Sequence, residues 1–178
     1  MDRIDTEKLN RWAKEIHDNA TAHGWHEEKH SPEHWLSLVM CEVAEAIEAD
    51  RNGKRCYMKK KLPYMSFDNF YRDFVKGTLE EEFADIVIRL LDMAVELYGE
   101  FEYLTSYGKI VPSTKLNLAE NLWFFVKNKL YFYQPQISES IAFIYDLAEH
   151  LSIDLDQHIE WKMKYNESRP YKHGGKKY

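Results

Sequence analysis

Two short acidic pairs interrupt otherwise apolar stretches of this sequence. The first is Glu42 and Glu45, within LVMCEVAEAIEA, and the second is Glu82 and Asp85, within EEEFADIVIRLLDMA. Helical residues three apart lie on one face, about 5–6 Å apart, so each pair could share one cation. If the two pairs face each other, their mutual repulsion would be costly without a cation or raised pKa values. The pattern therefore indicates a site for a divalent metal ion.

The ligand types favour particular metals. Neither cysteine nor histidine stands in step with the four acids, and carboxylate oxygens alone suit Mg²⁺ or Mn²⁺ better than Zn²⁺. A single acidic pair on a helix is more often a solvated face, and the neighbouring acids are interpreted that way: Glu48, Asp50, Glu80 and Glu81. The presence of two pairs, each embedded in apolar sequence, favours a metal site over a solvated face.

Candidate phosphate-binding residues occur near the C-terminus. Lys162, Asn166 and Arg169 follow one another at i, i+4 and i+7, with Tyr165 and Lys172 close by. The spacing places the first three on one face of a helix. An ordinary helix end, where cations interact favourably with the helix dipole, would look the same. The segment thus supports the acidic pairs without establishing a function alone.

The elements that must position these residues are helices. Apolar residues recur with helical spacing and none alternate with period two. Ser31-Pro32 and Thr78 are expected caps, with Thr78 and Glu81 forming a capping box, and Gln134-Pro135 is expected to end the fourth helix. The fold class is therefore all-α, with about six helices, a four-helix metal-binding core and an inserted aromatic segment. The expected helices span 6–22, 31–50, 78–98, 116–133, 138–151 and 155–168.

Composition bounds the setting of the protein. The 178 residues fit one domain, 1–178, and a net charge of −6 argues against a broad surface for duplex nucleic acid. No apolar run approaches the roughly 20 residues that span a bilayer, and the N-terminus is too polar for a secretion signal. A cytoplasmic protein is expected, with neither nucleic-acid nor membrane partners. Cys41 and Cys56 are interpreted as reduced thiols.

The two acidic pairs, Glu42-x-x-Glu45 and Glu82-x-x-Asp85, resemble those of the MazG-like and dCTP-pyrophosphatase branches of the all-α nucleoside triphosphate pyrophosphohydrolases. The segment IDLDQHIEWKMKYNESRPYKHGGKK looks like the tail of MazG-like proteins. Trp25 and His30-Ser31-Pro32 are similar to a Trp and a His-x-Pro of the dCTP-specific branch. The resemblance covers about 6–52, 78–98 and 150–175, and the segments near 54–77 and 99–149 are insertions relative to it.

The resemblance implies cleavage of a ribo- or deoxyribonucleoside triphosphate into the monophosphate and pyrophosphate, with nucleotide-pool house-cleaning as one role. It implies Mg²⁺, or Mn²⁺ as a substitute, at the four acids and assembly as a homodimer or homotetramer. Independently, the metal would neutralise phosphate charge while one carboxylate, by position Glu45, orients or deprotonates water. Which carboxylate does so stays open.

Other side chains would contact the substrate. Lys162 and Arg169 would offset triphosphate charge and Asn166 would donate a hydrogen bond. Trp25 or Trp35 could stack on the base, although core packing is the alternative for both and is favoured for Trp35. His30 is the favoured histidine for its His-x-Pro context. The other histidines near it are interpreted as surface or helix-end residues: His17, His23 and His34.

Two further functions compete with hydrolysis. One is a non-catalytic helical interaction module, whose working surface would be an aromatic stretch that is either deeply buried or packed on a partner subunit. That stretch comprises Leu122, Trp123, Phe124, Phe125, Tyr131, Phe132 and Tyr133. The other is a single-stranded nucleic-acid binder that uses Lys59, Lys60 and Lys61, which the net charge disfavours.

Overall fold

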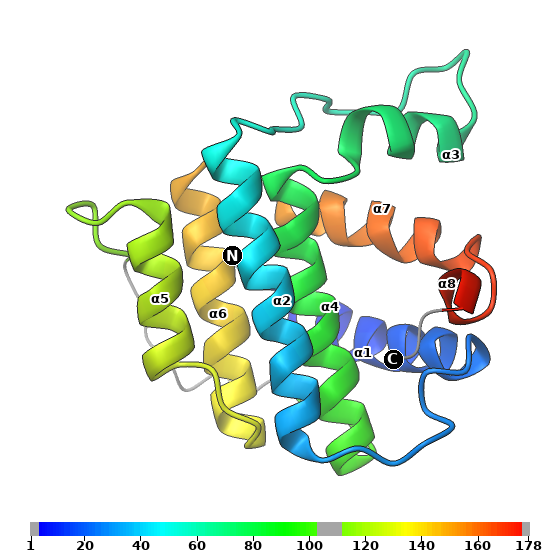
Figure 1. The fold of residues 1–178 in the computed structure, drawn as a ribbon, viewed down its shortest axis with the longest axis vertical. Helices are drawn as coiled ribbons and strands as arrows, with labels where there is room; N and C mark the ends of the chain where they lie inside the picture. The colour runs from blue at the N-terminus through cyan, green and yellow to red at the C-terminus, as the bar shows by residue number, and fades with distance from the viewer. Residues whose placement is uncertain (1–3, 103–111, 176–178) are drawn as a thin grey trace.

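The computed structural model describes residues 4–102 and 112–175, and within these ranges the chain forms helices and connecting loops without a β-strand (Figure 1). This confirms the predicted all-α helical bundle. No helix in the described part is long and apolar enough to cross a membrane. The elements are α1 (Thr6–Ala22), α2 (Pro32–Arg51), α3 (Phe67–Phe70), the π-helical turn η1 (Tyr71–Val75), α4 (Leu79–Tyr98), α5 (Leu118–Asn128), α6 (Gln134–His150), α7 (Leu155–Glu167) and α8 (Lys172–Gly175).

Helix α4 is the centre of the bundle. Helices α1, α2, α6 and α7 all pack against it, and Figure 1 shows α2 running beside α4 while α1 and α7 lie across it. The first turns of α4 are buried throughout, including their acidic residues. Functional side chains on α4 therefore face other helices rather than solvent.

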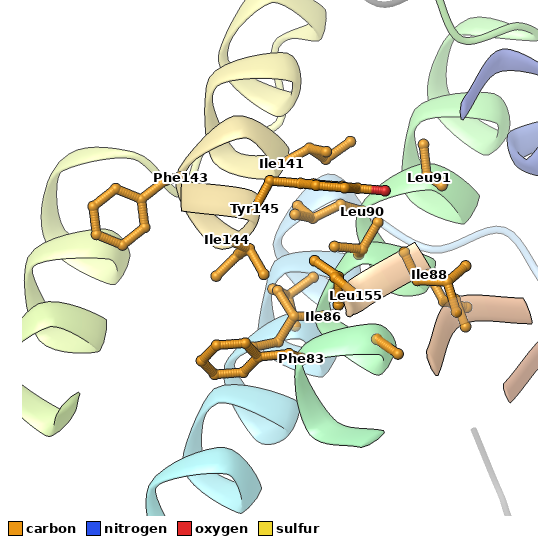
Figure 2. Close-up of a cluster of buried hydrophobic side chains, with 14 of the residues drawn as sticks. Phe83, Ile86, Ile88, Leu90, Leu91, Ile141, Phe143, Ile144, Tyr145 and Leu155 are labelled. Atoms are coloured by element: carbon orange, nitrogen blue, oxygen red, sulfur yellow. The ribbon is translucent and has the colours of Figure 1, made fainter. Parts of the chain in front are cut away.

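The main core gathers buried side chains of α1, α2, α5, α6 and α7 around α4. Figure 2 shows Phe83 and Ile86 of α4 close to Ile144 of α6, with Leu155 of α7 beside them, and all four side chains are buried. Each such side chain contributes about 1.5–3 kcal/mol when buried. Helix α6 falls within the predicted insertion 99–149 yet contributes directly to this core. The packing fixes the orientation of α4.

Helix boundaries follow the predictions except in the fourth and fifth predicted helices, the fifth of which begins at Gln134 rather than at 138. The fourth helix ends at Asn128 instead of running through 133, and Pro135 lies in the first turn of α6 instead of terminating its predecessor. Proline at this position costs no hydrogen bond, because the first N–H groups of a helix lack intrahelical partners anyway. The chain turns at Lys129 so that Leu130 enters the core. The expected linker from 99 to 114 lies largely outside the described residues.

The aromatic stretch is divided between core and surface. Leu122 and Phe125 are fully buried, and Phe125 stacks on Phe143 of α6 with ring centroids 5.8 Å apart. Trp123 is 65% exposed, and three other members are exposed as well: Phe124, Tyr131 and Tyr133. The prediction that the stretch is either buried or packed on a partner is therefore true of the buried members, while the exposed ones form an outer aromatic surface.

The segment 54–77 packs on α7. Its α3 and η1 turns bury Phe70, Tyr71 and Val75 in a small second hydrophobic cluster. Phe70 meets the edge of Trp161, and Tyr71 stacks on Tyr165 with centroids 4.2 Å apart. The segment is thereby held over the N-terminal end of α4, where it reaches the candidate site. Cys41 and Cys56 are free thiols, as predicted.

Candidate functional site

A polar stripe runs along the buried helix α4. Glu82, Asp85, Arg89, Asp92 and Glu96 follow one another at steps of three and four residues, which keeps all five on one face of the helix. Helices α1, α2 and α7 all pack on α4 and carry polar residues of their own. The stripe is thus the surface on which a site can form.

Three of the four predicted metal ligands converge at the start of this stripe. Glu42 and Glu45 of α2 and Glu82 of α4 each offer a carboxylate oxygen, and the three oxygens lie within 4.8 Å of one another. Glu42 and Glu82 are buried, whereas Glu45 is exposed and reaches the group from its open side. Helical pairs at i, i+3 do face each other across α2 and α4, as the sequence predicts.

The fourth predicted ligand, Asp85, is held differently. Its Oδ2 lies 2.5 Å from Nζ of Lys162, which also donates to Oε1 of Glu81 at 2.7 Å. Burial alone would lower the pKa of Lys162, but Asp85 and Glu81 outweigh it and raise that pKa. The ammonium group predicted to bind phosphate is therefore buried between two carboxylates of α4, because α7 crosses α4 directly above them.

Glu81 belongs to the same network, and its interpretation as a solvated residue is wrong. The side chain is buried and accepts hydrogen bonds from Tyr71 Oη at 2.8 Å and from the backbone N–H of Gly77. Thr78 does cap α4, since its hydroxyl accepts from the N–H of Glu81 at 3.4 Å. The Glu81 carboxylate, however, does not return to Thr78 as a capping box requires, because Lys162 and Tyr71 engage it.

The prediction that Glu80 is a solvated residue is also wrong. The Glu80 side chain too is buried, and it accepts from Arg55 Nε at 2.6 Å and from the backbone N–H of Cys56 at 2.8 Å. Glu48 and Asp50 are exposed, as expected of a solvated face. The difference arises from the segment 54–77, which supplies Arg55 and the N–H of Cys56 to Glu80, whereas the exposed Glu48 pairs with its helical neighbours Arg51 and Asn52.

Arg89 is a site residue that the sequence analysis missed. Its Nε donates to Oε1 of Glu42 at 3.1 Å. Burial alone would lower the pKa of Arg89, but Glu42 and Asp85 more than offset that effect, so the pKa is raised. Its spacing could have predicted this role, because Arg89 lies four residues after Asp85 and so on the same face of α4 as the acidic pair.

The acidic cluster holds more carboxylates than the neighbouring Lys162 and Arg89 can neutralise. Burial, reinforced by Asp85 and Glu81, raises the pKa of Glu82 to about 9. Burial, opposed by Lys162 and reinforced by Glu42, raises the pKa of Asp85 to about 7. Such shifts mean that the cluster takes up protons unless another positive charge is present. A divalent cation among Glu42, Glu45 and Glu82 would supply that charge, and an all-oxygen donor set fits Mg²⁺ or Mn²⁺.

A cavity of about 390 Å³ opens beside the acidic cluster. This volume lies within the range of small-molecule binding sites, roughly 300–1,000 Å³. Four predicted substrate-binding residues line it, together with residues the sequence analysis did not single out. The predicted ones are Trp25, Lys162, Asn166 and Arg169, and the additional ones include Glu15, Asn19, Lys76, Arg89, Asp92 and His173.

Three other predicted substrate-binding residues do not line the cavity. His30 stacks on His34 with ring centroids 3.9 Å apart, and Tyr165 stacks on Tyr71. Lys172 forms an ion pair of 3.0 Å with Glu27. These side chains are engaged with neighbouring loops and helices, which sequence spacing alone does not reveal. Trp35 is buried in the core, as favoured.

The C-terminal segment closes one side of the cavity. The backbone N–H of Lys172 donates to the carbonyl of His23 at 3.0 Å, and the Tyr171 ring lies directly over Gly24. A Cβ at position 24 would meet the far end of that ring, and the φ of +82° at this position is one that glycine adopts without strain. His173 is thereby brought edge-on to Trp25, with centroids 5.0 Å apart. These contacts hold the described part of the C-terminal segment against the loop that follows α1.

The histidines in and after α1 were predicted to be surface or helix-end residues, and His23 is one, since it caps the C-terminal end of α1. His23 bridges two helix ends, with Nδ1 2.7 Å from the carbonyl of Asn19 and Nε2 2.9 Å from that of Arg169. His17 is half-buried, and its Nδ1 lies 2.9 Å from Oδ1 of Asp92. His26 shares the same carboxylate and was not singled out.

Comparison with known proteins identifies no relative, because no family model, curated protein or solved structure matches this chain.

Proposed function

We propose that this protein is a Mg²⁺- or Mn²⁺-dependent nucleotide pyrophosphohydrolase of the MazG-like type. The observation that carries the proposal is the convergence of Glu42, Glu45 and Glu82 beside a cavity of nucleotide-compatible size. The reaction would add water across the anhydride between the α- and β-phosphates and yield a monophosphate and pyrophosphate. This is the activity that the resemblance of the acidic pairs implies.

Charge at the site supports a cation-dependent reaction. Five carboxylates line this part of the cavity, and the cations paired with them are the buried Lys162 and the half-buried Arg89. The carboxylates belong to Glu42, Glu45, Glu81, Glu82 and Asp85. A triphosphate is itself highly anionic and would be repelled by this surface. Bound divalent metal would supply the positive charge that neutralises the phosphates as they react.

The chain's own residues would divide the remaining tasks. Lys162 is a positioning residue, since it holds Asp85 and Glu81 in place. Glu45 is the exposed member of the acidic group and is suited to orient the attacking water or accept its proton. A fixed orientation of water and phosphate lowers the entropic part of the barrier.

Substrate groups would meet the other walls of the cavity. Asn166 Oδ1 is buried and has no hydrogen-bond partner in the described part of the chain, so this oxygen is available to accept a hydrogen bond from a ligand. Arg169 would offset phosphate charge, and Trp25 with His173 would provide an aromatic surface for the base.

The test is pyrophosphate release from a panel of ribo- and deoxyribonucleoside triphosphates with Mg²⁺, with and without EDTA. We expect Glu45→Gln to lower turnover by about 100-fold or more, because it removes a charged group from the reacting centre. Glu48→Gln is the matched control, since Glu48 is exposed on the same helix outside the cavity. EDTA-insensitive release, equal loss in both variants or no release from any nucleotide would overturn the proposal.

The outer aromatic surface, which α5 and the connection from α5 to α6 provide, favours an additional role in assembly. We infer that Trp123, Phe124, Tyr131 and Tyr133 contact another subunit, since exposed aromatic groups of this kind commonly mark protein interfaces. A homodimer or homotetramer in sedimentation equilibrium that dissociates on Trp123→Ser would support this inference. A wild-type monomer would contradict it. The surface would then be a candidate site for a different protein, as in an interaction module.

A further inference from the structure

A second cluster of metal-ligating side chains lies farther along the same stripe of α4. His17 of α1 and His26 of the following loop meet Asp92 and Glu96 of α4. Asp92 Oδ1 is 2.9 Å from His17 Nδ1 and 2.9 Å from His26 Nε2. Glu96 Oε2 is 3.0 Å from His26 Nδ1 and 3.9 Å from His17 Nε2. Each ring thus has Asp92 on one side and Glu96 on the other.

This arrangement fixes the orientation of both imidazoles. When each ring donates its N–H to Asp92, its second nitrogen presents a lone pair towards the Glu96 carboxylate. A lone pair and an anion repel each other, so the arrangement lacks a positive charge between them. His26 Nδ1 shows this directly: it is buried and lacks a hydrogen-bond partner among the described residues, since its contact with Glu96 does not have hydrogen-bond geometry.

We propose that His17, His26 and Glu96 form a second metal site, selective for a borderline transition-metal ion such as Zn²⁺. One ligand atom from each of the three lies within 4.8 Å of the others. A tetrahedral zinc ion with bonds of about 2.0–2.1 Å needs donor atoms roughly 3.3–3.4 Å apart, which small side-chain rotations provide. Water would complete the coordination, and Asp92 would orient both histidines from outside.

The donor set distinguishes this site from the acidic cluster. Two imidazole nitrogens and one carboxylate oxygen favour Zn²⁺ and related ions, whereas Glu42, Glu45 and Glu82 offer only oxygen. The histidine side chains are largely enclosed, with His26 only 5% exposed, so the ligands are held in place before a metal arrives. The site follows from this geometry and does not depend on pyrophosphohydrolase activity.

The test is a Zn²⁺ titration of untagged, EDTA-treated and desalted protein against a chromogenic chelator. Millimolar Mg²⁺ is included to occupy the acidic cluster, and no nucleotide is present. We expect one equivalent of Zn²⁺ per chain, and Co²⁺ in its place should give the visible absorption of a tetrahedral nitrogen-ligated ion. His26→Gln should abolish this binding, and Asp92→Asn should weaken it by about 10–100-fold as an outer-shell change.

The matched control is His150→Gln, because His150 is exposed at the end of α6 and far in sequence from the cluster. It should bind Zn²⁺ like the wild type. Glu96→Gln provides a second ligand variant at a partly exposed position, should His26→Gln fail to fold. Absence of stoichiometric Zn²⁺ binding, or binding unchanged by Glu96→Gln, would overturn the proposal and assign protons to the second ring nitrogens. Neither outcome of the Zn²⁺ titration changes what the pyrophosphate-release assay should show, so the two proposals can fail independently.

Discussion

The two ends of the polar stripe on α4 use the same helix face for different chemistry. At the N-terminal end, Glu82 meets further carboxylates of α2, and the donors are oxygen alone. Towards the C-terminal end, Asp92 and Glu96 meet His17 and His26, and nitrogen enters the donor set. The carboxylates of α4 are alike in both places. The elements that cross α4 therefore decide which metal each end suits.

The two ends also balance charge by different means. The acidic end is compensated by Lys162 and Arg89, whose charges persist at every physiological pH. The histidine end relies on imidazoles: hydrogen bonds from His17 and His26 outweigh burial and lower the pKa of Asp92, and the bond to Asp92 raises the pKa of His17. Loss of a compensating group should thus be most costly at the acidic end.

The largest expected effect tests that difference. Lys162→Met should lower the free energy of unfolding of the metal-free protein by about 3–5 kcal/mol, because it leaves two buried carboxylates without their cation. His17→Gln, which can still hydrogen-bond to Asp92, should cost only about 1 kcal/mol. Urea denaturation followed by circular dichroism measures both. Lys164→Met, an exposed change on the same helix, is the control and should cost under about 1 kcal/mol. Equal losses in all three would remove the distinction between the ends.

An intermediate effect concerns pH. The raised pKa values of Glu82 and Asp85, about 9 and about 7, mean that the folded protein binds protons more tightly than the unfolded chain. Their contribution is full below the ordinary carboxyl pKa and is lost as pH rises through 7 towards 9. The metal-free protein should therefore lose on the order of 2 kcal/mol over that range, about 5 °C in Tm.

The raised pKa of His17 acts in the same direction, while the lowered pKa of Asp92 matters only in acid. Glu82→Gln separates the contributions, since it removes the largest acidic shift and should flatten the Tm profile by more than His17→Gln does. Saturating Mg²⁺ should flatten it too, because the metal binds the deprotonated carboxylates. A profile unchanged by Glu82→Gln would place the titration at the histidine end.

The smallest expected effect is the coupling between the two ends. Glu82 and Glu96 are separated by about 21 Å along α4, given a rise of 1.5 Å per residue over their spacing. The effects of Glu82→Gln and Glu96→Gln on unfolding free energy should then add to within about 0.5 kcal/mol in the double variant. A coupling above about 1 kcal/mol would show that the stripe behaves as one site rather than two. Thermal or urea denaturation of the four proteins completes this cycle.

Local sequence patterns were sufficient to predict much of the acidic end of the stripe. Glu42, Glu45 and Glu82 interrupt apolar helical sequence, and the periodicity that predicts α2 and α4 also predicts that their acids face inward. Lys162, Asn166 and Arg169 were found in the same way, because i, i+4 and i+7 residues share a face whatever their partners. The all-α fold follows from the same periodicity. The role of Lys162 did not follow, since its partners Asp85 and Glu81 lie on another helix.

The sequence by itself thus determined the helices, their inward faces and the acidic pairs, because these depend on residues three or four apart. Only the tertiary structure decided which acids converge, that Glu80 and Glu81 are buried and that His26 joins His17 at α4. These outcomes depend on loops such as 54–77 and 23–31, whose path is set by long-range packing rather than by local spacing. A loop residue acquires its partner only when the helices on either side have docked.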